Sequence, residues 1–196
     1  EKSIQKETDE AINTFEDYFT LQFNEAKSTL NNQDKLTQLV TLSNSLKGDL
    51  SRSDIPKMSI KIQELLAKVN SEIKQTLDGV ITNLLDPALA TGIPGTTFTV
   101  EIDQLKAAVS SGAVAEGDEG SVTSGIDDAI LALNVKIDEV IDKKQTQDAF
   151  AERREDIVGK LADLMILNLD AKLALLAKCN DYISRSPSEA SSLALP

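Results

Sequence analysis

The fold is decided by one long amphipathic stretch, which reads PKMSIKIQELLAKVNSEIKQTLDGVITNLLD (residues 56–86). Its apolar residues recur every three or four positions, which is the spacing of one buried helix face. Asp54 can cap the start of this helix, and Pro56 fits its first turn because the missing N–H costs nothing there. Pro87 disfavours helix at the residue before it, so we expect the helix to end at Asp86. The apolar positions are Met58, Ile62, Leu65, Leu66, Val69, Ile73, Leu77, Ile81, Leu84 and Leu85.

The same periodicity predicts helices over about 3–30, 34–50, 99–109, 126–144 and 148–183, and Thr99 can cap the helix over 99–109. Residues 87–99 hold two prolines and two glycines, which favour a loop. A stretch rich in Ser, Gly and acidic residues, about 110–125, is expected to form a long mobile connection, and the Ser- and Pro-rich residues 184–196 a disordered tail. No alternation typical of a strand is present. The sequence therefore predicts an all-α antiparallel bundle of five or six amphipathic helices in one domain, residues 1–183.

Composition removes whole classes of function from consideration. The formal net charge is −12, which argues against binding nucleic acid or an anionic membrane surface. The chain has no His and a single Cys, so it can form neither a His-based catalytic triad nor a His- or thiolate-ligated zinc site. Adjacent acidic residues such as Asp127 and Asp128 point about 100° apart on a helix and do not converge. We therefore expect no enzymatic activity, no catalytic residues, no metal ligands and no cofactor.

The most apolar run of the chain is Leu161 to Ala177. It is interrupted by Asp163, Asp170 and Lys172, so we interpret it as a buried helix and expect no transmembrane segment. A helix that is apolar all round is either surrounded by its own bundle or faces something outside the chain. The second alternative allows part of this surface to line a lipid-sized cavity or to meet a partner.

Bundle interiors are a usual place for apolar ligand sites, and flexible aliphatic side chains suit an acyl chain better than a flat ring. We therefore expect a binding protein that sequesters a fatty-acid-like apolar ligand or adsorbs to hydrophobic surfaces. The alternative is a protein-interaction module, such as a secreted effector or adhesin, that uses an exposed apolar helix face. The candidate apolar ligand-binding residues are Phe15, Phe19, Phe23, Leu65, Val69, Ile137, Leu164, Met165 and Leu169. The candidates for orienting a polar head group are Tyr18, Tyr182 and Asn168.

The last third of the chain carries a resemblance to a known family. Its residues run from Val140-Ile141-Asp142-Lys143-Lys144-Gln145 to Phe150, then through Ile157-Val158-Gly159-Lys160-Leu161-Ala162-Asp163-Leu164 to Leu173–Leu176. This pattern resembles the fungal hydrophobic surface-binding and cell-wall galactomannoprotein family, in which an apolar helix ends in a Lys-Lys pair and a Phe follows. The resemblance implies a non-enzymatic protein, secreted or in the cell wall, that binds hydrophobic surfaces or fatty acids. It identifies no individual binding residue.

Overall fold

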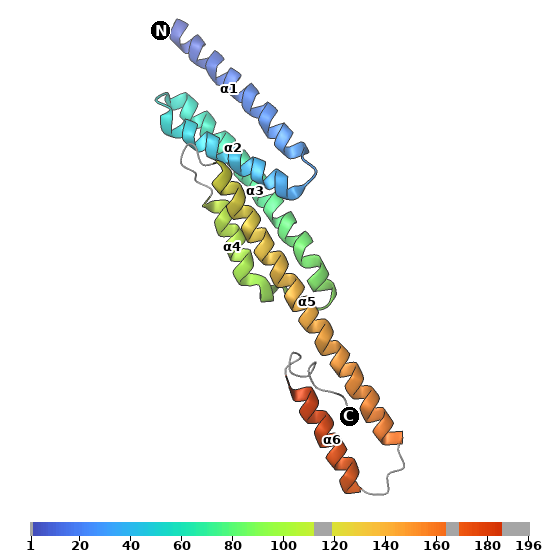
Figure 1. The fold of residues 1–196 in the computed structure, drawn as a ribbon. Helices are drawn as coiled ribbons and strands as arrows, with labels where there is room; N and C mark the ends of the chain where they lie inside the picture. Colours follow the sequence, from blue (N-terminus) through green and yellow to red (C-terminus); the bar gives the residue numbers. More distant parts are fainter. Residues whose placement is uncertain (1, 112–118, 164–168, 186–196) are drawn as a thin grey trace. The chain divides into compact units, whose positions relative to one another are not determined.

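The computed structural model describes residues 2–111, 119–163 and 169–185, and these form helices with no strand among them (Figure 1). The predicted all-α class is confirmed. The helices are α1 (Lys2–Ser28), α2 (Asn32–Arg52), α3 (Pro56–Ala90), the 3-10 helix η1 (Gly95–Phe98), α4 (Thr99–Ser110), α5 (Glu119–Asp163) and α6 (Leu169–Ser184). The sequence led us to expect one bundle over residues 1–183. The structure divides into two compact units, Glu1–Lys136 and Ile137–Pro196, and each is described by itself.

The first unit begins with three successive helices, α1, α2 and α3, and each packs antiparallel to the one before it (Figure 1). Two ion pairs fix the direction of α1 against α3: Lys57 Nζ lies 3.2 Å from Asp9 Oδ1, and Lys61 Nζ lies 3.2 Å from Glu16 Oε2. Because both residue numbers increase together, α1 and α3 are parallel and α2 is antiparallel to each. Lys61 also contacts Glu64 at 3.3 Å, and its hydrogen bonds to Glu16 and Glu64 raise the pKa of Lys61 above its usual 10.5.

The early part of α5 belongs to the same unit and is anchored by apolar burial. Ile126, Ile130 and Leu133 are all nearly inaccessible to solvent, as the predicted helical spacing requires. A hydrogen bond of 2.7 Å from Gln33 Nε2 to Asp127 Oδ1 joins the start of α2 to this part of α5. The acidic side chain at Asp127 therefore has a structural partner on another helix.

The end of α3 differs from the prediction, because the helix continues through Pro87 to Ala90. Pro87 removes only the one backbone hydrogen bond that its own N–H would donate, and the helix continues for just three residues beyond it. The helix stops at a glycine instead: Gly92 has φ +82°, the left-handed conformation that ends many helices. The amide of Gly92 donates to the Leu89 carbonyl at 2.9 Å, and that of Ile93 to the Ala88 carbonyl at 3.1 Å. These two bonds form the pattern that closes a helix on a left-handed glycine, and the Thr91 amide donates to the same two carbonyls.

Replacing Gly92 by alanine is expected to destabilise the first unit by about 1–2 kcal/mol, because an L side chain is strained at positive φ. Chemical denaturation followed by circular dichroism measures the change. Gly95→Ala is the matched control, since a Cβ there would meet only the Leu89 and Leu85 side chains at ordinary distances of 3.8 and 3.9 Å. Equal losses in the two variants would contradict the role given to Gly92.

Two of the predicted helix starts also differ in detail. Pro56 does occupy the first position of α3, as expected, but the capping position is Ile55 and Asp54 makes no cap. Thr99 was expected to cap α4, yet it is the first helical residue, and its hydroxyl donates to the Thr96 carbonyl at 2.8 Å. The reason is that η1 leads directly into α4, so the backbone is already turning when it reaches Thr99.

The bounds of α5 correct two further predictions. The helix begins at Glu119, so residues 119–125 are helical and not part of a mobile connection, while residues 112–118 lie outside the described part. The helix also continues past Lys143 and Lys144, where we expected it to end. No Gly or Pro follows before Gly159, and Lys144 instead pairs with Asp148 one turn on, at 3.1 Å.

The second unit consists of the later part of α5 and of α6. The rings of Phe150 and Tyr182 meet edge to face with centroids 5.4 Å apart, and Arg154 Nη2 donates to Asn180 Oδ1 at 3.4 Å. Residue numbers fall on one helix as they rise on the other, so the two segments are antiparallel. The helix expected over 148–183 is thus divided between α5 and α6, and residues 164–168 and the predicted tail after Arg185 lie outside the described residues.

Candidate functional site

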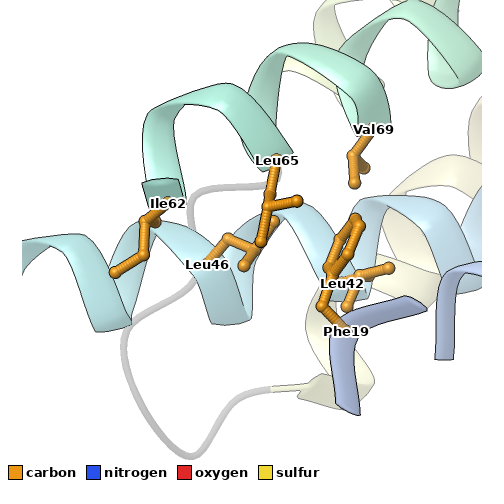
Figure 2. Close-up of a cluster of buried hydrophobic side chains, with 6 residues drawn as sticks. All are labelled: Phe19, Leu42, Leu46, Ile62, Leu65 and Val69. Atoms are coloured by element: carbon orange, nitrogen blue, oxygen red, sulfur yellow. The ribbon is translucent and has the colours of Figure 1, made fainter. Parts of the chain in front are cut away.

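Five of the predicted ligand-binding residues come together between α1, α2 and α3. Phe19, Leu65 and Val69 are buried and belong to one apolar cluster, whose other buried members are Leu42, Leu46 and Ile62 (Figure 2). Phe15 and Phe23 are half-buried against the same cluster, and the rings of Phe19 and Phe23 stack with centroids 5.3 Å apart. These side chains pack on one another and form the core that holds the first three helices together.

The other predicted residues are dispersed. Tyr18 is 62% exposed and its hydroxyl accepts a hydrogen bond from Gln22 Nε2 at 3.1 Å, so it does not share the core with the phenylalanines. In the second unit Ile137 is buried on α5, and Tyr182 is half-buried beside Phe150. Leu169 is the first residue of α6. Leu164, Met165 and Asn168 lie outside the described residues.

A cavity of about 410 Å³ lies between α2, α3 and α4, and we call it the α2–α3–α4 groove. Its base is apolar: Val40 and Leu77 are buried, and Ile73 and Val109 are half-buried. The volume falls in the range of about 300–1,000 Å³ that is typical of small-molecule sites, which are also mainly apolar with a few polar groups. The groove is partly open to solvent, so a ligand could enter without unfolding the bundle.

Polar side chains from all three helices also line the groove. Ser43 on α2 is only 3% exposed, and its hydroxyl donates to Asn70 Oδ1 on α3 at 3.3 Å. Asn44 and Ser110 also contribute to the lining. The Ser43–Asn70 bond satisfies a buried hydroxyl and links two walls of the groove, which keeps the spacing of α2 and α3 fixed.

The mouth of the groove carries three exposed lysines, one from each wall: Lys47 on α2, Lys74 on α3 and Lys106 on α4. None of the three forms an ion pair with any residue that the structure describes. Asp78 is the one acidic residue in the lining. In a chain with 32 acidic and 20 basic residues, this is a local reversal of the overall charge.

None of the groove residues was among the predicted site residues. Lys74 and Asn70 lie one turn apart on α3, next to Leu77, so the sequence does show a polar strip beside the apolar stripe of that helix. Such a strip is also what an ordinary solvent-exposed helix face has. Only the relative placement of α2, α3 and α4 distinguishes the lining of a groove from an ordinary solvent-exposed face.

The remaining candidate features of the described residues are a metal site, the single cysteine and a membrane-spanning helix. No group of three or more acidic, Cys or His side chains is placed there to hold a metal ion. Cys179 is buried on α6. None of the described helices combines the length and apolarity needed to cross a bilayer.

Comparisons with models of known families, with curated proteins and with solved structures found no match to this chain. The resemblance to the fungal hydrophobic surface-binding family therefore stays a prediction from the sequence.

Proposed function

We propose that the protein is a non-enzymatic binding protein that takes up a fatty-acid-like ligand, with the acyl chain on the apolar base of the α2–α3–α4 groove. The observation that carries this proposal is the groove itself, in which apolar side chains lie below a mouth of charged ones. A fatty acid has the same division between an apolar chain and a polar end. The secreted or cell-wall location that we propose rests on the family resemblance alone.

The magnitude of apolar burial indicates what affinity to expect. An acyl chain that buries about 300 Å² would gain about 7 kcal/mol, at about 25 cal/mol per Å². This gross gain has to offset the loss of ligand freedom, and a dissociation constant of 1 μM already requires about 8 kcal/mol. We therefore expect an affinity no tighter than micromolar, as suits reversible uptake and release.

Filling the groove should abolish uptake. Val109→Trp places a large ring at the base of the groove and is expected to weaken binding of palmitic acid at least tenfold, as measured by displacement of a dansyl-labelled fatty acid. The control is Val100→Trp on the same helix, because Val100 is 64% exposed and lies on the opposite side of α4. The proposal fails if the wild-type protein takes up no fatty acid, or if both variants bind as the wild type does.

The second candidate is the protein-interaction module. It is favoured by an exposed apolar pair on α5, Leu131 at 60% and Val135 at 49%, which lie one turn apart. Adsorption to a hydrophobic surface would use the same kind of exposed side chain. Self-association measured by light scattering, together with no uptake of fatty acid, would favour this candidate over ligand carriage.

A further inference from the structure

We infer that the groove selects amphiphiles with an anionic head group, and that Lys47, Lys74 and Lys106 bind this group. The inference rests on the proposed function and adds the chemical class of the ligand: a long-chain carboxylate in preference to an uncharged alcohol or ester. Three lysines line the groove, and none of them has an ion-pair partner among the described residues.

The three lysines come from three different helices and from distant parts of the sequence, yet they line one cavity. Several lysines elsewhere in the first unit are ion-paired, such as Lys35 with Glu72 at 2.8 Å and Lys57 with Asp9, whereas the exposed Lys68 forms no ion pair with any described residue. With no such partner among the described residues, the charges of the groove lysines are left to act on a ligand. Asp78 opposes them with a single negative charge.

The apolar wall of the groove strengthens the effect of these charges on a ligand. Charges of one sign above a low-dielectric wall concentrate their field in the cleft and attract counter-charged ligands. Lysine is itself amphipathic, because its methylene stem can lie along an apolar surface while its ammonium group stays in water. Lysines at the mouth can therefore extend the apolar base of the groove and hold a carboxylate at the same time.

The net charge of −12 helps to separate the effect of the groove lysines from that of the rest of the protein. The protein as a whole repels anions, so an anionic ligand gains from this groove only through the local lysines. An uncharged ligand of the same chain length gains from the apolar base alone. Comparing the two ligands thus separates the head-group contribution from the chain contribution.

The test compares palmitate with hexadecanol, both below their aggregation limits, on the full chain. The wild type is expected to bind palmitate about tenfold more tightly, the effect of roughly three exposed ion pairs. Combining Lys47→Gln, Lys74→Gln and Lys106→Gln should remove this preference and leave hexadecanol binding unchanged. Asp78→Asn should tighten palmitate binding about twofold, and added salt should reduce the preference.

A matched triple variant provides the control. Lys68→Gln, Lys143→Gln and Lys178→Gln alter three exposed lysines outside the groove and change the net charge equally. This control should keep the wild-type preference. The inference is overturned if the wild type binds the two ligands equally, or if both triple variants lose the preference alike. Absence of binding by either ligand would instead overturn the proposed function.

Discussion

Replacing Phe19 by alanine is expected to lower the free energy of unfolding of the first unit by about 3–5 kcal/mol, the range for removing a buried aromatic ring. Phe19 is 3% exposed and belongs to the cluster that joins α1 to α2 and α3 (Figure 2). The remaining links between α1 and α3 include the surface ion pairs of Lys57 with Asp9 and Lys61 with Glu16, which contribute little compared with a buried ring because solvent screens them. The variant should therefore release α1 before it unfolds α2 and α3.

Chemical denaturation gives the total loss, and amide hydrogen exchange shows whether it falls first on α1. The control is the neighbouring residue: Tyr18→Ala removes a ring that is 62% exposed, and we expect it to change stability by no more than about 0.5 kcal/mol. Phe19→Leu should fall between the two, because it keeps most of the apolar volume. A Phe19→Ala variant as stable as Tyr18→Ala would show that the cluster does not hold α1.

Phe98→Ala should have a comparable effect on stability, about 3–5 kcal/mol, and a direct effect on the groove. Phe98 is fully buried at the end of η1, immediately before α4, and η1 packs against α3. The side chain therefore anchors the helix that supplies Val109 and Lys106 to the groove. Without this anchor, α4 should separate from α3, and the groove should lose one wall.

Two measurements on the Phe98→Ala variant distinguish loss of the wall from general unfolding. Hydrogen exchange should accelerate in α4 more than in α2, and fatty-acid uptake should fall at least tenfold under conditions where α2 and α3 remain folded. Val100→Ala on the exposed side of α4 should change neither quantity. Retained uptake with a detached α4 would show that α4 is not needed for binding.

Much of the fold could be predicted because apolar periodicity dictates which side of a helix is buried. Ile62, Leu65 and Val69 are buried as their spacing requires, and Phe19 and Phe23 stack as residues one turn apart should. Helix ends were predicted less well. Pro87 and the Lys143–Lys144 pair are compatible with a helix end but do not require one. In the structure, α3 continues beyond Pro87 to Ala90, and α5 continues beyond Lys144 to Asp163.

The groove could not be predicted from the sequence for a different reason. Lysines such as Lys47, Lys74 and Lys106 look like solvent-exposed residues in their own helices, and nothing local places them around one cavity. Phe98 did have a detectable signal, since an aromatic residue in a short segment between Pro94 and a helix is a natural anchor. The two prolines and two glycines of residues 87–99 favour a loop instead, and this signal outweighs that of the aromatic residue.

The walls of the groove come from consecutive helices, and only residues 53–55 separate α2 from α3. Bringing neighbours together closes short loops, which costs little chain entropy and favours rapid formation. All three walls have been synthesised once the ribosome has passed Ser110, with α5 and α6 still to be made. We therefore expect α2, α3 and α4 to begin folding during translation.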